Sequence, residues 1–391
     1  MRAALYVHIP FCKSRCAYCD FNTYAGLEDL LPDYVTAVCR EMEALGRRWG
    51  APEVPTVYFG GGTPSLLSPT LLGRLLDTAA RAFRLRSDAE ISLEANPGTV
   101  NRATLRSFRS LGVNRLSLGV QSVHAEELRL LGRIHTWPEA VAAVAAAREA
   151  GFVNLNLDFI FGLPGQTLAR WEETLQAALA LAPEPLSLYC LTVEADTPLA
   201  RRIAAGLLPP PDDDRSAEMY QLAESRLADA GFFHYEISNW ARAPSPPPRR
   251  WAAVEEVSPF VCRHNLVYWR NEPWLGVGAG AHSWAAGRRW ANRRHPRAYI
   301  AALSSGDSPV AEEEVINRRL EMGETMMMGL RLAEGVSASR FRSRFGLELA
   351  QVFGEELAAL VERGLLTWDG RAARLTAHGR LLGNQVFMEF L

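Results

Sequence analysis

Three cysteines near the start of the chain, Cys12, Cys16 and Cys19, constrain this sequence more than any other feature. They follow an apolar run, residues 4–11, at the spacing Cys-x3-Cys-x2-Cys, so three thiolates share one short loop. Three such thiolates can hold three irons of a four-iron, four-sulfur cluster, which leaves the fourth iron open to another ligand. The alternatives are a zinc knuckle, a disulfide or chance core cysteines. Zinc knuckles prefer paired Cys-x2–4-Cys or Cys/His sets, so the spacing favours the cluster.

The composition of the 391 residues is that of an ordinary globular protein, with 48% hydrophobic and 22% charged residues. The net charge of −2 gives no basic field that would recruit nucleic acid, and we expect none as a partner. No apolar run reaches the roughly 18 residues that span a bilayer, and the first residues do not resemble a signal peptide. We therefore expect a cytoplasmic protein without a transmembrane segment. Cys39 and Cys190 lie in apolar patterns and are expected to be core residues.

Short apolar runs alternate with longer amphipathic runs over about the first 200 residues, a pattern typical of βα units and a parallel sheet. The predicted strands are residues 5–9, 56–59, 91–94, 115–119, 154–161 and 186–191. The predicted helices are residues 32–49, 68–83, 101–111, 137–150 and 168–181, with Ser68 as an N-cap before Pro69. Six such units predict an α/β fold, an open (β/α)6 partial barrel, whose chemistry would sit at the carboxyl ends of the strands.

The remainder of the chain departs from this alternation. Residues 243–259 are rich in proline and predict an exposed loop or insertion. Residues 338–391 contain two helical patterns and a hairpin that turns at Asp369 and Gly370, which together resemble a winged-helix module of the α+β class. The predicted domains are a barrel over 1–240, a middle segment over 241–300 and a smaller C-terminal domain over 301–391.

Polar residues and glycines follow several of the predicted strands. Gly60, Gly61, Gly62, Thr63 and Pro64 follow the second strand, where free amide groups can bind a ligand. Further along the chain, the strand ends carry Glu94, Gln121, Asp158 and, just beyond the fourth strand, Arg133. A carboxylate can bind an ammonium group, a guanidinium can bind a carboxylate, and a strand-end aspartate can hold ribose hydroxyls. Taken singly, each residue is more commonly a cap or part of a rim salt bridge, whereas together they offer partners for a ligand with an amine, a carboxylate and a ribose.

Taken together, these residues resemble the radical S-adenosylmethionine superfamily, in its branch of oxygen-independent coproporphyrinogen III oxidases and their relatives. The motifs that carry the resemblance are Tyr6 to Cys12, Cys16 to Cys19, Gly60 to Pro64, Glu94 to Pro97, Gln121-Ser122, and Asp158 with Gly162, Leu163 and Pro164. The resemblance implies that Cys12, Cys16 and Cys19 are the iron ligands. It also implies that the nucleotide is held by Tyr6, Tyr18, Gly61, Gly62, Thr63, Glu94, Gln121, Arg133, Asp158 and Thr192.

Two features depart from the oxidases in that branch. The oxidases carry a further cysteine two positions after the third ligand, where this chain has Phe21. The resulting Asp-Phe-Asn variant is similar to heme chaperones of the HemW type. So is a second motif, in which residues 262–269 read Cys-Arg-His-Asn-Leu-Val-Tyr-Trp and a glycine-rich segment follows up to residue 283.

In that subfamily the His-Asn-x-x-Tyr-Trp motif is associated with heme, and imidazole and aromatic side chains suit a flat iron macrocycle. The candidate heme residues are Cys262, His264, Tyr268, Trp269 and His282. The axial ligand stays open among His264, Cys262 and His282. Without the resemblance, His264 would be read as a hydrogen-bonded core histidine beside packed aromatic rings.

The resemblance implies a heme chaperone with a four-iron cluster and S-adenosylmethionine, which transfers heme to an acceptor protein such as a membrane-associated cytochrome. A second hypothesis is a radical enzyme that oxidatively decarboxylates coproporphyrinogen III. A third is radical opening of the heme ring. Phe21 and the motif at His264 to Trp269 favour the chaperone.

Overall fold

Six parallel strands lie side by side in chain order at the centre of the computed structural model, which describes residues 1–243 and 253–391. They are β1 (Ala4–Ile9), β4 (Glu53–Gly61), β5 (Arg84–Ala95), β6 (Arg115–Gln121), β7 (Leu155–Phe161) and β8 (Pro185–Cys190). The sequence predicted all six, and the observed strands mostly extend beyond the predicted ones. The parallel order places every carboxyl end on the same edge of the sheet.

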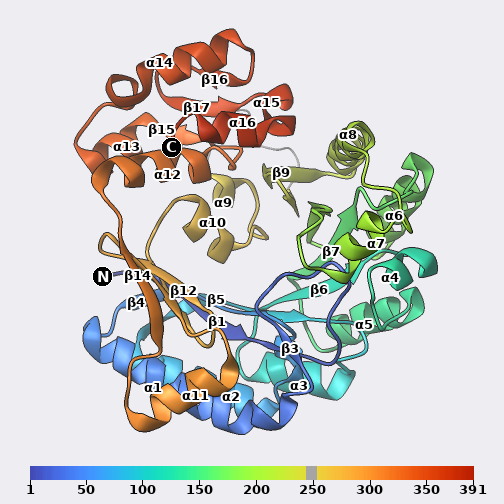
Figure 1. The fold of residues 1–391 in the computed structure, drawn as a ribbon, viewed down its shortest axis with the longest axis vertical. Helices are drawn as coiled ribbons and strands as arrows, with labels where there is room; N and C mark the ends of the chain where they lie inside the picture. The colour runs from blue at the N-terminus through green and yellow to red at the C-terminus, as the bar shows by residue number, and fades with distance from the viewer. Residues whose placement is uncertain (244–252) are drawn as a thin grey trace.

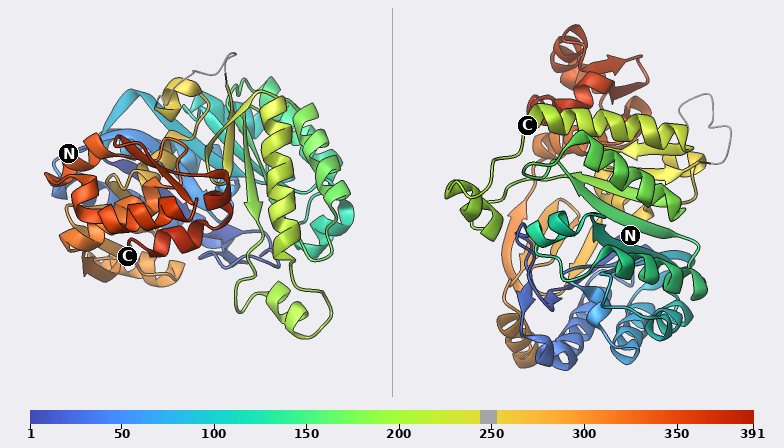
Figure 2. Two further views of the ribbon diagram at one scale, coloured as in Figure 1. Left: turned by 90° about the horizontal axis from the view of Figure 1, so that it is seen from above. Right: turned by 90° about the vertical axis from the view of Figure 1, so that its right-hand side faces the viewer.

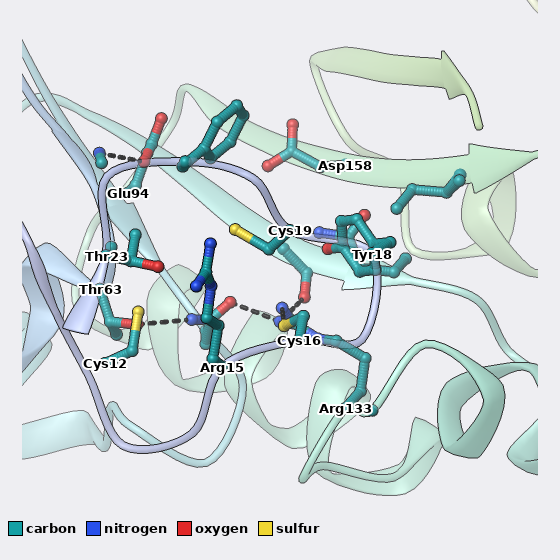
Figure 3. A pocket seen from close by; sticks show the side chains of 18 of the residues that line it. Cys12, Arg15, Cys16, Tyr18, Cys19, Thr23, Thr63, Glu94, Arg133 and Asp158 are labelled. Atoms are coloured by element: carbon teal, nitrogen blue, oxygen red, sulfur yellow. Dashed lines mark hydrogen bonds between the residues drawn. The ribbon is translucent and has the colours of Figure 1, made fainter. Parts of the chain in front are cut away.

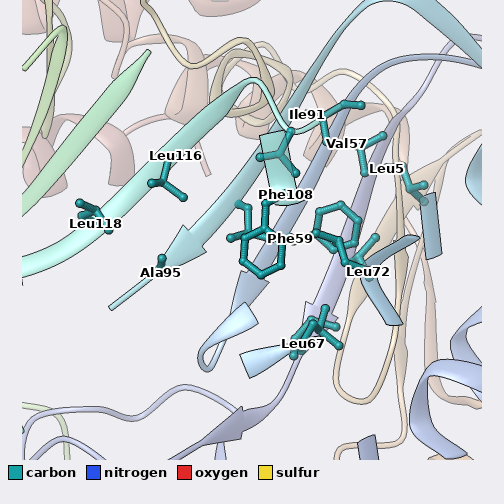
Figure 4. Packing of buried hydrophobic residues seen from close by; sticks show 14 of the residues in the cluster. Leu5, Val57, Phe59, Leu67, Leu72, Ile91, Ala95, Phe108, Leu116 and Leu118 are labelled. Carbon is teal, nitrogen blue, oxygen red and sulfur yellow. The ribbon is translucent and has the colours of Figure 1, made fainter. Parts of the chain in front are cut away.

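Helices between these strands cover the outer face of the sheet (Figure 1). They are α1 (Leu31–Arg48), α2 (Pro69–Ala82), α3 (Arg102–Ser110), α4 (Ala125–Leu130), α5 (Trp137–Glu149) and α6 (Leu168–Ala180), and α7 (Pro198–Ala204) and α8 (Asp213–Asp229) follow β8. Ser68 caps α2 as predicted, because its hydroxyl accepts from the Leu71 amide. Figure 4 shows the core beneath α2 and α3, where Phe59 and Phe108 pack with Leu72. These units form the open (β/α)6 barrel that the alternation predicts.

The sheet continues on both sides of the six parallel strands, which the sequence did not predict. Beyond β8 it adds β10 (Asn239–Arg242) and β9 (Phe232–Glu236), both running antiparallel to their neighbours. Beyond β1 it adds β11 (Trp274–Val277), β12 (His282–Ala285), β13 (Arg288–Asn292) and β14 (Val310–Val315), with α11 (Pro296–Ser305) between the last two. The glycine-rich segment after the second motif therefore belongs to the same sheet as the barrel.

Two short helices, α9 (Val254–Val257) and α10 (Arg263–Trp269), lie on the other side of the sheet from α1 and α2 (Figure 1). Most of the predicted proline-rich loop, residues 244–252, lies outside the described residues. The part that follows it differs from the prediction, because α9 turns both Val254 and Val257 into the interior.

The C-terminal unit has a hydrophobic core of its own. It comprises α12 (Arg318–Gly329), β15 (Val336–Ser337), α13 (Ala338–Phe345), α14 (Leu349–Glu362), β16 (Leu366–Trp368), β17 (Ala372–Leu375), α15 (Ala377–Leu381) and α16 (Gly383–Met388). The two helices and the hairpin at Asp369 and Gly370 confirm the predicted winged-helix-like unit. Figure 2 shows it at the end of the molecule opposite α1. The division at residues 240 and 300 stays a prediction, and the pairing of β14 favours a later second boundary.

No helix within the described residues has the length and apolar character needed to cross a bilayer.

Candidate cluster and nucleotide site

The cysteine loop leaves the carboxyl end of β1 and is tied to the barrel at several points. β2 (Phe11–Cys12) pairs with β3 (Tyr24–Ala25), which closes the loop at its base. In the middle of the loop, the Ala17 amide donates to the carbonyl of Leu131, and the Ala17 carbonyl accepts from the Leu199 amide, both at 2.9 Å. These bonds hold the loop across the strand ends without using any cysteine side chain.

All three cysteines line one cavity of about 450 Å³ at the carboxyl ends of the strands. Figure 3 shows Cys12, Cys16 and Cys19 on the loop, with Glu94 and Asp158 on the strands behind it. Burial raises the pKa of both Cys12 and Cys19. The loop also packs closely on the glycine run, since a Cβ at Gly62 would lie 2.6 Å from the carbonyl oxygen of Phe11 and 3.0 Å from Cys12 Sγ.

The donor set fits the predicted cluster. Within the described residues, no three His, Cys, Asp or Glu side chains converge on a point where a single ion could bind. Such convergence suits one zinc ion, whereas each thiolate of a four-iron cluster holds a different iron. Three free cysteines around one cavity, with polar atoms left unpaired beside them, are what a larger inorganic group requires.

Glu94 lies on β5 at the floor of the cavity, with both carboxylate oxygens held. Its Oε1 accepts from the Tyr58 hydroxyl at 2.8 Å, and its Oε2 accepts from the Gly61 amide at 3.1 Å. Burial, reinforced by the negative charge of Asp158, raises the pKa of Glu94 to about 7. A buried carboxylate that is difficult to ionise alone is well suited to a cationic ligand, which would stabilise its charge.

Arg133 brings a guanidinium to the cysteine side of the cavity. It donates to Cys16 Sγ at 3.3 Å, to the Gly119 carbonyl at 2.6 Å and to the side-chain oxygen of Asn96. Its Nε has no partner among the described residues, and neither has Oε1 of the neighbouring Gln121. Gln121 ends β6 with a positive φ of 72°, a strained conformation that often marks functional sites.

Asp158 lies on β7 in a group of small polar side chains. Its two oxygens accept from Ser117 Oγ at 3.0 Å and from Asn156 Nδ2 at 2.7 Å. Burial raises its pKa. Asp158 and Ser117 both line the cavity, so a hydroxyl-bearing ligand could join this network.

Most of the predicted nucleotide residues come together in this cavity. Those that line it are Tyr18, Gly61, Gly62, Thr63, Glu94, Gln121, Arg133, Asp158 and Thr192. Tyr6 lies outside the lining, and its hydroxyl is hydrogen bonded to His8 Nδ1 at 2.9 Å. These placements leave the assigned roles as predictions.

Sequence reasoning missed several lining residues. They are Tyr58, Asn96, Ser117, Tyr189 and Cys190. The polar members of β6 stand at alternating positions, so the two-residue period of a strand could have predicted Ser117 from Gln121. The prediction that Cys190 is a core residue is wrong, because it ends β8 and is exposed at the cavity.

The second motif packs against β4 and β5, on the amino-terminal side of the residues by which these strands line the cavity. Glu90, four residues before Glu94 on β5, accepts from the backbone amides of Arg263 and His264 at 3.0 and 3.1 Å. His264 is 1% exposed, and its two ring nitrogens are hydrogen bonded to Thr56 and Tyr268, each at 2.9 Å. Burial lowers the pKa of His264 to about 3. In this conformation neither nitrogen is free to bind iron.

The other candidate heme residues differ in accessibility. Cys262 is buried against Glu90, and burial raises the pKa of its thiol to about 12. The Tyr268 ring meets Trp274 edge-on at 5.0 Å, and the Trp269 ring lies beneath the guanidinium of Arg331 at 4.5 Å.

His282 alone among the candidate ligands has an exposed side chain. Its imidazole makes no hydrogen bond within the described part of the chain. Partial burial lowers the pKa of His282; the Glu312 carboxylate opposes this shift, while Arg289 and Arg294 add to it, and the net lowering keeps the ring mostly neutral near pH 7. A neutral, accessible imidazole can ligate the iron of a porphyrin, and the neighbouring Arg294 could pair with one of its carboxylates.

Two family models match the sequence. The Radical SAM superfamily matches residues 6–178, and the HemN C-terminal domain matches residues 316–382. The first covers the cysteine loop and the first five parallel strands of the barrel, from β1 to β7, and the second covers most of the C-terminal unit. Membership of the superfamily implies a four-iron cluster and S-adenosylmethionine as cofactors.

Relatives match over the full length of the chain. "Heme chaperone HemW" of Bacillus subtilis (strain 168) is 38% identical over 387 residues, which cover 99% of this chain and 98% of the relative. The protein of the same name from Mycobacterium tuberculosis (strain H37Rv) is 39% identical, with 99% and 94% covered. "Radical S-adenosyl methionine domain-containing protein 1, mitochondrial" of Mus musculus is 36% identical, with 100% and 87% covered.

A solved structure confirms the fold. The coproporphyrinogen III oxidase HemN from Escherichia coli, described as a radical SAM enzyme, superposes with a TM-score of 0.84 at 27% sequence identity. The match covers 100% of this chain and 90% of that one. Full-length identity nevertheless reaches 38–39% with the chaperones. The chain belongs to the HemW family of radical SAM proteins.

Proposed function

We propose that this protein binds heme and transfers it to an acceptor protein, and that a four-iron cluster and S-adenosylmethionine occupy the cavity at the strand ends. The observation that carries the heme part is His282, an exposed and neutral imidazole on the sheet that also forms the barrel. The full-length relatives named heme chaperones support the same function.

At the cavity, Cys12, Cys16 and Cys19 would each hold one iron. When bound, the cluster supplies an open iron that can chelate S-adenosylmethionine and an electron that can be passed to it. Glu94 would hold the amino group, Arg133 the carboxylate and Asp158 the ribose. The lining contacts would be completed by Tyr18, Gly61, Gly62, Thr63, Gln121 and Thr192.

For heme, we assign His282 as the axial ligand, because His264 and Cys262 are buried and already paired. Tyr268 and Trp269 then support the segment that carries β11 and β12. Arg294 lies close enough to influence the charge of His282 and is suited to bind a propionate, whereas Arg289 already donates to both oxygens of Glu324 at 2.7 Å. The acceptor would be a membrane-associated cytochrome, and the transfer would take place in the cytoplasm.

The test is a heme titration of the reconstituted protein under anaerobic conditions. His282→Ala should shift the absorption spectrum and weaken heme binding, whereas His378→Ala, another exposed histidine, should change neither. Heme transfer from the loaded protein to an apocytochrome should be detectable by the acceptor spectrum. Normal heme binding by His282→Ala would overturn the ligand assignment, and absent heme binding by the wild type would overturn the function.

A radical decarboxylase is the second candidate, because the HemN structure covers the whole chain. Phe21, which lines the cavity and is 65% exposed, stands where the oxidases carry a further cysteine. We therefore expect no decarboxylation of coproporphyrinogen III with S-adenosylmethionine and a reductant. Sustained product formation would favour the enzyme over the chaperone.

A further inference from the structure

The second motif reaches the nucleotide cavity through a stack of rings. The imidazole of His264 lies 5.1 Å from the ring of Tyr58 at an interplanar angle of 28°. Tyr58 is on β4 and lines the cavity, and its hydroxyl donates to Glu94 Oε1 at 2.8 Å. His264 is thus one ring away from the carboxylate at the floor of the cavity.

His264 has little freedom to move in this position. Thr56 and Tyr268 bind its two ring nitrogens at 2.9 Å each, and its backbone amide donates to Glu90. Glu90 and Glu94 belong to the same strand, β5, so the motif and the cavity share one rigid element. A shift of α10 would therefore move the surface on which Tyr58 rests.

Gly60 provides independent evidence that Tyr58 and Glu94 are tightly packed. A Cβ at this position would lie 2.9 Å from Tyr58, 3.1 Å from Tyr6 and 3.2 Å from Oε1 of Glu94. The ring of Tyr6 lies 6.3 Å from that of Tyr58, nearly parallel to it. Only glycine lets the two tyrosines and the carboxylate converge without displacement.

The orientation of the Glu94 carboxylate in the cavity depends on the Tyr58 hydroxyl and the Gly61 amide. Tyr58 holds one oxygen and the Gly61 amide holds the other, so the carboxylate is fixed at both ends. The Tyr58 ring that carries this hydroxyl rests on the imidazole of His264, so the position of His264 limits where the hydroxyl can point. The second motif can therefore influence how Glu94 meets the ligand, although the motif itself does not contact the ligand.

We propose that Tyr58 and His264 are positioning residues for the S-adenosylmethionine site, through which the second motif sets the orientation of Glu94. This inference rests on the proposed function for the role of Glu94 in binding the amino group. It gives His264 a role that requires no contact with heme, and it explains why its ring is buried.

The test compares S-adenosylmethionine affinity among variants that retain the cluster. Tyr58→Phe keeps the ring but removes the hydroxyl, and should weaken binding about tenfold, the loss expected for one hydrogen bond to a charged group. His264→Ala should weaken binding severalfold, and His264→Phe, which restores a stacked ring, should recover part of the loss. Tyr220→Phe is the matched control, because this buried hydroxyl donates to the Ile237 carbonyl instead.

A double-mutant cycle separates positioning from general damage. In a Glu94→Gln background, Tyr58→Phe should have almost no further effect, because its partner has already changed. The pH midpoint for binding should also rise in Tyr58→Phe, since the lost hydrogen bond favours the ionised carboxylate. Unchanged affinity in Tyr58→Phe and His264→Ala, with cluster content intact, would overturn the inference.

A different result would show that the proposed role of Glu94 in binding S-adenosylmethionine is wrong. If Glu94→Gln itself binds S-adenosylmethionine normally, then the assignment of Glu94 is wrong. If Glu94→Gln weakens binding while the Tyr58 and His264 variants do not, only the positioning role is lost.

Discussion

Two regions of the barrel use similar side chains for different purposes. At the carboxyl ends of the strands, the cavity leaves Gln121 Oε1 and Arg133 Nε without partners in the described structure, and three thiols face the same space. On the amino-terminal side of this cavity, His264 has a protein partner for each ring nitrogen and is buried. We call the first region the open end, because its polar groups can still bind a ligand. We call the second the closed end, because its polar groups are already hydrogen bonded within the protein.

This contrast shows that a polar residue indicates a ligand site only when some of its hydrogen-bonding groups are left without a partner. A buried polar group is stable only when its hydrogen bonds are made, so groups left unpaired mark where a ligand can add bonds. His264 meets its own requirement and stabilises the fold. Glu94 is held by two donors but remains difficult to ionise, and a cation would relieve this cost.

The largest expected effect lies at the open end. Cys16→Ala should abolish the four-iron cluster, because each thiolate holds a separate iron and the loop has no fourth cysteine to replace it. Iron and sulfide analysis after anaerobic reconstitution measures this. Cys39→Ala is the control, since this thiol packs between α1 and α2 and should leave the iron content unchanged. A complete cluster in Cys16→Ala would contradict the assignment.

At the closed end we expect a loss of stability instead. His264→Ala leaves the hydroxyls of Thr56 and Tyr268 without their partner and should cost about 3 kcal/mol of unfolding free energy. Denaturant unfolding measures the change. His378→Ala, at an exposed position, should cost little. Glu94→Gln should not lower stability near pH 8, because the folded protein disfavours the ionised carboxyl that it removes.

An equal loss of stability in His264→Ala and Glu94→Gln would remove the distinction between the two ends. Unchanged stability in His264→Ala would show that its hydrogen bonds contribute nothing to the fold.

The sequence predicted the open end better than the closed one, for a physical reason. Parallel strands align their carboxyl ends, so Glu94, Gln121 and Asp158 could be placed together from strand periodicity alone. The contact of His264 with Tyr58 joins residues more than 200 positions apart, through a helix whose docking site no local pattern encodes. The strands added beyond β1 and β8 depend on similar long-range pairing. Cys190 was misplaced because an apolar strand end looks like core until its neighbours are known.

The pH dependence of S-adenosylmethionine binding provides the next test. The pKa of Glu94 is raised to about 7 by burial and by Asp158, against the opposing influence of the Tyr58 hydrogen bond and of Arg115. The carboxyl is therefore mostly protonated at pH 6 and mostly ionised at pH 8. Affinity for the amino group should rise about tenfold over this range, as the ionised fraction does. Equilibrium titration of the cluster-loaded protein measures it, and Glu94→Gln should lose this rise.

The smallest expected effect concerns Asn22, which connects the cysteine loop to the glycine-rich segment before His282. Its Nδ2 donates to the carbonyls of Ala279 and Arg294, both at 2.9 Å, and its backbone carbonyl is bonded to His8. Asn22→Ala removes these two side-chain bonds and a third, which its Oδ1 accepts from the Tyr24 hydroxyl at 3.1 Å, and should cost about 1 kcal/mol of stability. Because the loop is less firmly held, a chelator should remove iron about threefold faster, the kinetic equivalent of less than 1 kcal/mol. Asp20→Ala, an exposed neighbour in the same loop, should leave the rate unchanged. Equal rates in both variants would show that the cysteine loop and the His282 segment are mechanically independent.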